Sequence, residues 1–515
     1  MATNLADLLS QLEVFEPHPP IPKLKITGIS DNSAHVRPGN IFVAIKGYEF
    51  DGHDYIGQAI AQGAAAVIAE RRITTEVPLF IVPDSRIALA KLSNAWFGYP
   101  GKSMILIGVT ASNGKTTTSF MIDSVLSRHY PVTGLIGTVI VKDGRSTEGA
   151  GLTTPNSREL FEILARMRDN GCSHVTMEVS SAGLELHRVH GIDFNIVTFN
   201  NVTREHIDFH GSFEKYWHHK TKLVKNLAPA STAILNGDDP LIRELCQQTK
   251  ADYITYSLKG NPAHIQVEDI DLSTGSGSFR YIIPQPVHSR NFTLSPCNLA
   301  FKLKVLGLHN IYNATVAITV GKLCQVPDGQ IYAALRSFSG VERRFQLIYD
   351  GDFKVIDDHF ANTGNIDITL ATLGLMEYRR LHLLIAIRGS RGSTVNRENT
   401  ETVVKWLPLL PLGELVLTDS EEFVGVHDVV TPEEKAAVLD TLDDAGIKYR
   451  HFPRLTDAIH AVVEAAQTDD VILMGGCQGL DYGAHVLIPL LAKRHPPAEQ
   501  REILQILTGR VAGLS

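Results

Sequence analysis

Cysteine is scarce in this chain of 515 residues, and long apolar runs are missing. The five cysteines are scattered, odd in number and never arranged as C-x-x-C, which argues against a disulfide framework and against a thiolate zinc site. No stretch reaches the ~20 apolar residues that span a bilayer. The first residues lack the basic start and apolar run of a signal peptide. We therefore expect a cytoplasmic protein without membrane insertion.

An excess of basic residues is missing as well. Lys and Arg number 48 against 56 Asp and Glu, so the formal charge is −8. A broad nucleic-acid surface needs excess cations to displace counterions, and we expect no nucleic-acid partner. A local basic pocket or a metal ion still permits a small anionic ligand. Hydrophobic residues make up 44% and charged residues 20%, the balance of a folded globular protein.

The pattern of short apolar runs and helical stretches predicts an α/β fold with three domains. Residues 1–100 combine β-branched runs with an alanine-rich helical stretch. Residues 101–338 begin with a buried strand and alternate strands with helices, which predicts a central, mainly parallel sheet that binds a mononucleotide. Within them, 252–306 alternate in a way typical of antiparallel strands. Residues 339–515 return to βα alternation and predict a Rossmann-like C-terminal domain.

The most informative segment is MILIGVTASNGKTTTSFMIDSVL, which starts at Met104. A hydrophobic strand leads through a glycine-bearing turn into a helix, whose first N–H groups and positive dipole end suit phosphate oxygens. Lys115 supplies a positive charge for the β- and γ-phosphates, the Thr116 hydroxyl can bind Mg²⁺, and Gly114 lets the backbone approach closely. Gly108 precedes Gly114 by one position too many for the usual phosphate-loop spacing, so a plain strand–turn–helix corner remains the alternative.

A second polar group lies further along the same domain. Glu178 ends a buried strand, where a carboxylate is costly unless it is paired or binds a cation. His206, Asp208, His210 and Lys220 follow the next strand. Oxygen ligands with an occasional imidazole suit a hard cation, so Glu178 and His206 are candidates for a Mg²⁺ site. For the histidines taken singly, an ordinary hydrogen-bonded role remains the alternative.

Several motifs together resemble the Mur ligases. They are GVTASNGKTTT, GLIGT at 134–138, TTP at 153–155, MEVSSAGLELHRVHG at 177–191, FNNVTREHIDFHGSFEKYWHHK at 199–220, LNGDDP at 235–240 and GLHNIYNA at 307–314. Within this family the chain is most similar to the MurE type, which adds the third residue to a UDP-N-acetylmuramoyl-dipeptide, because 38–67 resemble that type's first domain. The resemblance covers roughly residues 26–345.

The resemblance implies an ATP-dependent ligase of peptidoglycan synthesis that activates a carboxylate as an acyl phosphate and joins an amino acid to it. It implies ATP and two Mg²⁺ ions as cofactors, small-molecule substrates, and a monomer or weak oligomer. The N-terminal domain would bind the UDP-sugar and the C-terminal domain the amino acid. A ligase for a folate- or cyanophycin-type acceptor, and a non-catalytic nucleotide-binding protein built on the same fold, remain alternatives.

Site residues follow from the motifs that match. The nucleotide would be held by Asn113, Gly114, Lys115, Thr116, Thr117, Asn310 and Arg343. The metal ions would be held by Thr116, Glu178, His206 and Lys220, the last matching the lysine that the family carbamylates to N6-carboxylysine. Lys115, Lys220, Glu178 and His206 would form the catalytic set. The substrate would contact Ser33, Thr153, Thr154, Ser180 and Arg188.

The chain departs from the family pattern at several places. In the phosphate loop Ala111 stands where the family has its middle glycine. In the first domain D-S-R becomes Asn32-Ser33-Ala34, and in the third domain D-Y-A-H-x-P becomes DDHFAN at 357–362.

The C-terminal motifs that select the amino acid also depart. The D-N-P-R motif becomes DSEE at 419–422, and the late G-K-G-H-E becomes GGCQGLDYG at 475–483. Loss of an arginine that clamps a carboxylate indicates a different incoming amine. Arg388 and Arg391 are candidates for a replacement anion site, with ordinary surface arginines as the alternative.

Overall fold

The computed structural model describes residues 3–15, 20–47, 50–203, 211–273 and 275–508, together with Arg510 and Ala512. Contacts divide the chain into two compact units, which are described separately. One contains Met1–Ala111, Leu126–Thr255 and His288–Thr293, and the other contains Ser112–Val125, Tyr256–Val287 and Leu294–Ser515. The predicted domain boundaries at 100 and 338 remain predictions.

The N-terminal part of the first unit is a four-stranded parallel sheet. Its strands, in spatial order, are β3 (Gly28–Ser30), β4 (Asn40–Val43), β5 (Ala66–Ala69) and β6 (Leu79–Ile81). The helices are α1 (Leu5–Leu9), α2 (Ile56–Ala61) and α3 (Ser85–Trp96). Helix α3 begins where Asp84 accepts hydrogen bonds from two N–H groups of its first turn, a strong N-cap. The predicted strands and the alanine-rich helix of this region are confirmed.

The remainder of the first unit contains a second sheet. Its strands run in the order β10 (Thr147–Gly149), β9 (Ile140–Lys142), β8 (Thr133–Ile136), β11 (His174–Glu178), β7 (Ile105–Thr110), β12 (Ile196–Phe199), β13 (Thr232–Asn236) and β14 (Asp252–Ser257). From β8 to β13 the strands are parallel. Their carboxyl ends therefore share one edge, where ligands of such sheets bind.

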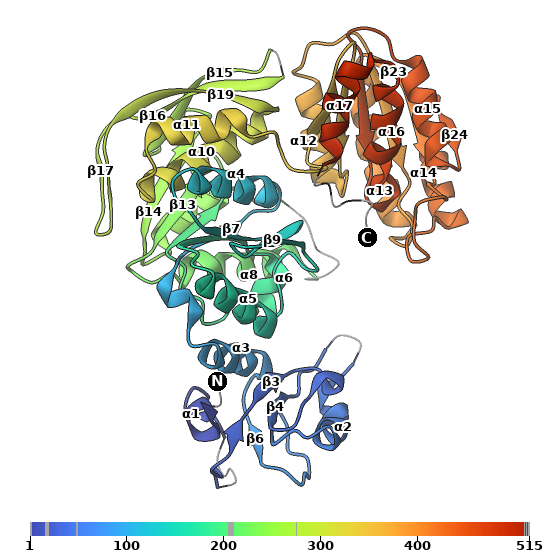
Figure 1. Cartoon of the computed structure of the whole chain (residues 1–515). Coiled ribbons are helices and arrows are strands. Elements are labelled where there is room, and N and C mark those ends of the chain that lie inside the picture. Colours follow the sequence, from blue (N-terminus) through green and yellow to red (C-terminus); the bar gives the residue numbers. More distant parts are fainter. Residues whose placement is uncertain are drawn as a thin grey trace. The chain divides into compact units, whose positions relative to one another are not determined.

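Helices α5 (Ser157–Asp169), α6 (Ser181–Glu185), α8 (Phe213–Lys225) and α9 (Pro240–Glu244) complete this part. In Figure 1, α5, α6 and α8 lie together along the sheet that contains β7. A continuous apolar core joins Leu160 and Phe161 of α5 to Val175 and Met177 of β11 and to Leu223 of α8. Burial of such side chains is the main source of stability, at roughly 1.5–3 kcal/mol each.

The second unit begins with helix α4 (Lys115–Ser127) and the antiparallel strands β15 (Ile265–Asp271), β16 (Ser276–Ile283) and β19 (Cys297–Leu306). These strands continue the sheet from β14, and their buried face packs against α10 (Leu308–Leu323) and α11 (Asp328–Ser337). The alternation in 252–306 correctly predicted antiparallel strands for β15, β16 and β19, and every second residue of β16 is buried. For 252–257 the prediction was wrong, because β14 pairs with β15 in parallel.

The C-terminal part of the second unit is a six-stranded sheet. Its order is β20 (Gln346–Asp350), β21 (Lys354–Asp358), β25 (Val471–Gly475), β22 (Leu381–Ala386), β23 (Leu412–Thr418) and β24 (Arg450–Phe452), with β20 antiparallel to the others. The helices are α12 (Thr363–Leu373), α13 (Ser393–Trp406), α14 (Pro432–Asp444), α15 (Leu455–Ala465), α16 (Gly483–Ala492) and α17 (Pro497–Leu504).

Two separate apolar cores cover the two faces of this sheet. On β25, Val471 and Leu473 belong to one core, whereas Ile472 and Met474 belong to the other. The alternation follows from the two-residue period of a strand. Helices α12, α13 and α14 contribute to the first core, and α15 and α16 contribute to the second. This doubly covered parallel sheet confirms the predicted Rossmann-like domain.

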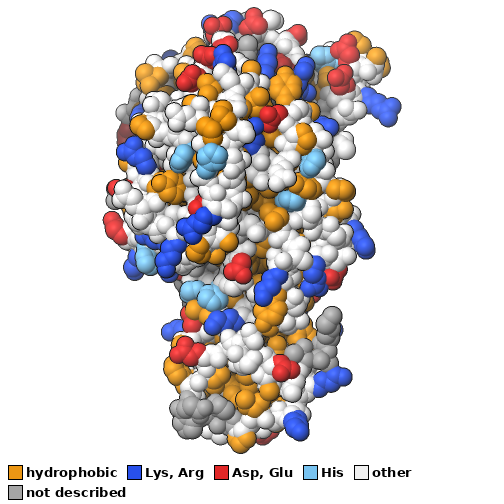
Figure 2. Space-filling model, turned by 90° about the vertical axis from the view of Figure 1, so that its left-hand side faces the viewer, with side chains coloured by type: hydrophobic (Ala, Val, Ile, Leu, Met, Phe, Trp, Pro, Cys, Tyr) orange, Lys and Arg blue, Asp and Glu red, His pale blue; other side chains and the backbone are white. Residues whose placement is uncertain are grey.

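The surface carries charges of both signs. Figure 2 shows acidic and basic side chains interspersed over the face in view. None of the described helices has the length and apolar character needed to cross a bilayer.

A buried charge cluster fixes one end of the C-terminal sheet. Asp470 accepts hydrogen bonds from Arg379, from His382 and from the N–H of Gln467, at 2.8–3.0 Å. Burial alone would raise the pKa of Asp470, but these hydrogen bonds hold it below its ordinary value.

We predict that Asp470→Asn lowers the free energy of unfolding by about 2–3 kcal/mol, because it removes the buried charged acceptor of His382 and Arg379. A depressed carboxyl pKa stabilises the folded state above the unfolded-state value of ~3.9 and loses that effect below it. The difference from wild type should therefore be full at pH 7 and shrink as the pH falls below about 4 in urea denaturation. Asp469→Asn, at the exposed neighbour, is the control. A pH-independent difference would contradict this assignment.

Candidate nucleotide and substrate site

The turn between β7 and α4 has the geometry of a phosphate loop. Gly114 adopts φ +84°, a left-handed conformation that side chains disfavour, and α4 begins at the next residue. The Lys115 ammonium donates to the carbonyl of Ser112 at 2.9 Å, so its side chain folds back over the turn. Thr116 and Thr117 are buried in the first turn of the helix. Ala111, the departure from the family pattern, is fully buried at the end of the strand.

A chain of buried hydrogen bonds connects this turn to α10. The Thr118 hydroxyl donates to Oδ1 of Asn313 at 3.0 Å, and Nδ2 of Asn313 donates to Oδ1 of Asn310 at 3.0 Å. Asn310 in turn donates to the carbonyl of Leu306 at 2.8 Å. A Cβ on Gly114 would lie 2.8 Å from Oδ1 of Asn313. The H-N motif and the phosphate loop are therefore one packed unit, in which Asn313 is the link that sequence reasoning missed. Its spacing of one helical turn from Asn310 was the available signal.

Glu178 lies at the carboxyl end of β11 and is fully buried. Its carboxylate accepts the backbone N–H of Thr138 at 2.9 Å and the Thr138 hydroxyl at 3.0 Å. The Thr138 hydroxyl also lies 3.1 Å from that of Thr153. Thr138 belongs to the GLIGT segment, but only the fold reveals that it orients this carboxylate.

The predicted substrate residues meet around the same strand end. The Thr154 hydroxyl lies within hydrogen-bond distance of the Glu178 carbonyl, at 3.0 Å, and of the Ser180 hydroxyl, at 3.1 Å. Arg188 donates to the carbonyl of Thr154 at 2.8 Å. Thr153, Thr154, Ser180 and Arg188, chosen from separate motifs, thus form one network with Glu178.

Lys220 is buried inside α8, with an exposure of 1%. Its ammonium lies 4.9 Å from the ring centre of Tyr216 and 5.7 Å from that of Phe199. Removing a lysine from water is costly unless other groups compensate for it. His206 lies outside the described residues, as do Asp208 and His210. Within the described part of the chain, no three His, Cys, Asp or Glu side chains form a metal-binding group.

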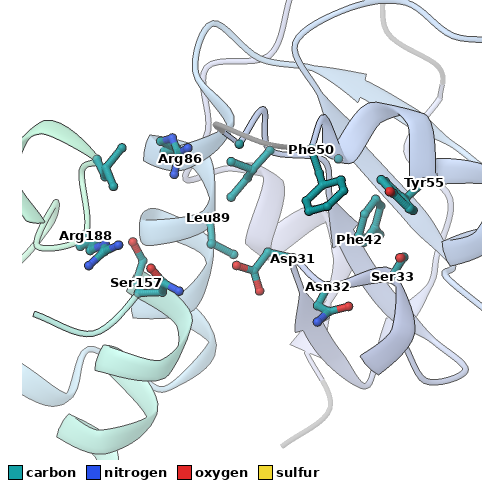
Figure 3. A pocket seen from close by; sticks show the side chains of 15 residues that line it. Asp31, Asn32, Ser33, Phe42, Phe50, Tyr55, Arg86, Leu89, Ser157 and Arg188 are labelled. Carbon is teal, nitrogen blue, oxygen red and sulfur yellow. The ribbon is translucent and has the colours of Figure 1, made fainter. Parts of the chain in front are cut away.

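A cavity of about 470 Å³ in the first unit contains the other predicted substrate residue, Ser33. Figure 3 shows Arg86 and Arg188 on one side of it and Asp31, Asn32 and Ser33 on the other. The aromatic side chains of Phe42, Phe50 and Tyr55 also line it. Ser33 donates to Gln58 at 2.8 Å. Aromatic faces with two guanidinium groups suit a planar ring that carries phosphate.

Arg343 is buried among residues of the C-terminal part. It contacts Asp357 and Asp481 and donates to the carbonyls of Gly476 and Cys477. Burial opposes its charge, but the two carboxylates raise the pKa of Arg343. The guanidinium that the family resemblance assigns to ATP is thus engaged inside its own domain in this structure, and its role toward ATP remains a prediction.

The segment DSEE, at 419–422, has no arginine that could bind a carboxylate, and its acidic side chains contact other residues of the C-terminal part. Asp419 pairs with Lys435 at 2.5 Å and with His451 at 3.0 Å. Glu422 accepts the N–H groups of Leu455 and Thr456 at the start of α15. These carboxylates therefore stabilise a strand end and a helix start.

The two candidate replacement arginines have different surroundings. Arg388 donates to the carbonyl of Ala361, and it lines a small cavity at the carboxyl ends of β22 and β25. Arg391 is half-exposed and lies 4.0 Å from Asp428. The Glu434 carboxylate accepts hydrogen bonds from the N–H groups of Ser390, Arg391 and Gly392, and it thereby fixes the loop that contains Arg391.

Comparisons with known proteins agree with this geometry. Family models match at 25–95 (Mur ligase family, catalytic domain), at 109–321 (Mur ligase middle domain) and at 343–477 (Mur ligase, glutamate ligase domain). The UDP-N-acetylmuramoyl-L-alanyl-D-glutamate–2,6-diaminopimelate ligase of Bacillus cereus is 31% identical, over 99% of both chains. The ligase of the same name from Bacillus licheniformis is 32% identical, over 88% of this chain and 89% of the relative.

Solved structures show the same fold. A UDP-N-acetylmuramoyl-L-alanyl-D-glutamate–2,6-diaminopimelate ligase aligns with a TM-score of 0.68 at 21% identity, over 96% of this chain and all of that one. The MurF ligase of Thermotoga maritima, solved in complex with ADP, aligns with a TM-score of 0.59 at 20% identity, over 91% of this chain and 98% of that one.

We predict that Gly114→Ala weakens ADP binding at least about tenfold, because a left-handed alanine costs about 1–2 kcal/mol and its methyl group displaces Asn313. Isothermal titration calorimetry with ADP and Mg²⁺ measures this effect. Gly149→Ala is the control, since no atom lies within 4 Å of a Cβ there. Equal affinities of the two variants would show that this turn does not bind the nucleotide.

Proposed function

Because the chain belongs to the Mur ligase family of ATP-dependent amide ligases, we propose that it joins an amine to the terminal carboxylate of a UDP-N-acetylmuramoyl-dipeptide or a closely related conjugate. The observation that carries this proposal is the phosphate loop between β7 and α4, within the matched middle domain. The aromatic and arginine-lined cavity of the first unit supplies a place for the uridine nucleotide.

The reaction divides into two steps. A carboxylate oxygen of the substrate attacks the γ-phosphorus of ATP, and ADP leaves, which gives an acyl phosphate. The amine then attacks the acyl carbon, the carbon–oxygen bond to phosphate breaks, and the amine loses a proton as the amide forms. The first step brings anionic oxygens together, and the second develops negative charge on the acyl oxygen and on the leaving phosphate. Positioning and positive charge therefore supply most of the catalysis.

Different residues of the chain bind the phosphates, the conjugate and the adenine. Lys115 and the first N–H groups of α4 bind the β- and γ-phosphates, beside Asn113, Gly114 and Thr117. Thr153, Thr154, Ser180, Ser33 and Arg188 orient the conjugate, and Arg188 is the positive charge among them. Asn310 holds the adenine side through the buried chain that ends at Thr118.

Members of the family use Mg²⁺ with ATP. The donor chemistry present fits this cation, because the Thr116 hydroxyl and the Glu178 carboxylate are hard oxygen ligands. We assign Thr116 to one ion and Glu178, His206 and modified Lys220 to a second. Bound Mg²⁺ supplies charge neutralisation for the transferring phosphoryl group.

Lys220 fits this assignment only after carbamylation. Its neutral amine adds to CO₂ and loses a proton, so that a cation becomes a carboxylate on the same stem. Its 1% exposure and the two aromatic rings beside the ammonium keep the group away from water. A buried carbamate that binds Mg²⁺ also resolves the cost of a buried ammonium.

The incoming amine is where this chain differs from its named relatives, which are diaminopimelate ligases. At the end of the DSEE segment, Glu422 caps α15 and offers a negative charge instead of an arginine. A second carboxylate on the amine would be repelled there. We therefore propose an amine without the distal carboxylate of diaminopimelate, with Arg388 as the remaining cation at the carboxyl end of β22.

We expect ADP formation with UDP-N-acetylmuramoyl-dipeptide to depend on both the conjugate and the amine. In a panel of amines, kcat/KM with diaminopimelate should be at least about tenfold below that of the best amine, since a lost charged contact is worth about 1.5–3 kcal/mol. Coupled ADP release measures the rates. Preferential use of diaminopimelate would contradict the assigned amine class, and no ADP formation with any pair would contradict the ligase itself.

We predict that Lys220→Ala lowers kcat at least about 100-fold and that added formate or acetate restores part of it, since the lost group acts as a carboxylate. Lys215→Ala, at an exposed position of the same helix, should keep full activity. Wild-type rates in Lys220→Ala without any added carboxylate would rule out the carbamate.

A further inference from the structure

A second cavity lies in the first unit, apart from the one that contains Ser33. Its volume is about 480 Å³, close to the 470 Å³ of the other. Its wall consists of the end of α8 with the residues that follow it up to Ser231, of Ile87 from α3, and of the segment 184–194, which leads from α6 to β12. No step of the proposed reaction uses it.

The interior of this cavity is apolar and its rim is charged. Leu184, Val189, Phe194, Leu223 and Leu227 line it and are themselves buried. Cavities of this size with a mainly apolar wall and a few polar groups are typical of small-molecule sites.

One lysine lies at the rim. Lys222 lines the cavity, and its ammonium lies 3.4 Å from Nδ1 of His219. Burial lowers the pKa of His190, and His187 and Lys91 lower it further. Burial also lowers the pKa of His187, with Lys222 and Arg86 acting in the same direction against Asp84. The imidazoles are therefore neutral at pH 7.

Two carboxylates lie near the rim. Asp84 accepts two N–H groups at the start of α3 and lies 3.7 Å from His187. Asp193 is exposed on the outer side of the rim. The apolar interior and the Lys222 ammonium favour a molecule with an apolar body and one anionic group.

The two cavities share a wall. Leu186 and Arg188 line the cavity that contains Ser33, whereas His187 and Val189, between and beside them, line the second cavity. Two neighbouring residues of α3 also line different cavities, because Arg86 lines the first and Ile87 lines the second.

The shared segment is held in a particular conformation. His187 has φ +55°, which is disfavoured for a residue with a side chain. Its carbonyl accepts the Ser157 hydroxyl at 3.4 Å, and Ser157 lines the first cavity. Arg188 donates to Thr154, which contacts Glu178. A molecule that displaces His187 thus moves groups that face the substrate.

We propose that the second cavity is an effector site for a small amphipathic anion, and that its occupancy changes the affinity for the conjugate through the segment 184–194. The coupling rests on the proposed function of the first cavity; the binding itself does not. By linkage, the conjugate must change the affinity for the effector by the same factor.

The probe for this site is 8-anilinonaphthalene-1-sulfonate, a fluorescent amphipathic anion, titrated into the full chain. Ala228→Trp fills the cavity from its exposed rim and should weaken dye binding at least about tenfold, whereas Ala230→Trp, exposed and outside the lining, should not. Lys222→Gln should weaken it about threefold or more, with Lys225→Gln as its control. Dye binding unchanged in both Ala228→Trp and Lys222→Gln would overturn the site.

The coupling is measured as the dissociation constant of UDP-N-acetylmuramoyl-dipeptide with and without saturating dye. We expect a change of about fivefold or more in wild type and none in Ala228→Trp. No change in wild type would overturn the coupling. If the conjugate does not bind even without dye, the proposed function fails, and amide hydrogen exchange decides the coupling instead. Dye should then alter exchange in 184–194 and around Ser157, and unchanged exchange there would overturn it.

Discussion

The nucleotide chemistry of this protein depends on one backbone constraint, the left-handed φ of Gly114. With this conformation the chain turns after β7, and α4 begins at Lys115. The first N–H groups of the helix therefore point out of the turn. The space beside Gly114 is occupied by Asn313, which also bonds Thr118 and Asn310. A phosphate-binding turn and the start of α10 are therefore stabilised together, and a side chain at position 114 would disturb both.

A second constraint is electrostatic. A ligase of this class must bring a carboxylate up to a triphosphate, and the repulsion between them falls only if cations and oriented donors are already in place. The chain has an overall negative charge, so we propose that it meets this need locally, through Lys115, Arg188 and the oxygens assigned to Mg²⁺. Glu178 keeps its orientation because Thr138 donates to both of its oxygens. Carbamylation of Lys220 would change the sign of the charge at the one buried lysine of α8.

Much of the fold could be predicted from the sequence because its signals are local. Apolar runs of strand length, the glycine turn at Gly114 and the alternation in 252–306 each depend on near neighbours. The family and the ligase class followed from the order of several motifs, and the comparisons confirm both. The individual site residues and the domain boundaries at 100 and 338 remain predictions, although Thr153, Thr154, Ser180 and Arg188 do lie together around Glu178.

The partners that the fold brings from distant positions could not be predicted. Nothing near Glu178 in sequence indicates Thr138, and nothing near Glu422 indicates that it caps α15. The same holds for Arg343, because its partner Asp357 lies in β21 and its partner Asp481 follows β25 by several residues. The loss of an arginine at position 422 was visible in the sequence, but its replacement by a helix cap was not. The second cavity could not be predicted either, because its lining combines the segment 184–194 with the end of α8 and with Ile87 of α3.

The proposed reaction requires the transfer of a phosphoryl group from ATP to the substrate's own carboxylate. Turnover of a conjugate whose terminal carboxylate carries ¹⁸O tests this transfer, with the released phosphate analysed by mass spectrometry. An acyl phosphate intermediate requires that one labelled oxygen pass from the carboxylate to each phosphate. Phosphate released without label during amide formation would contradict the account.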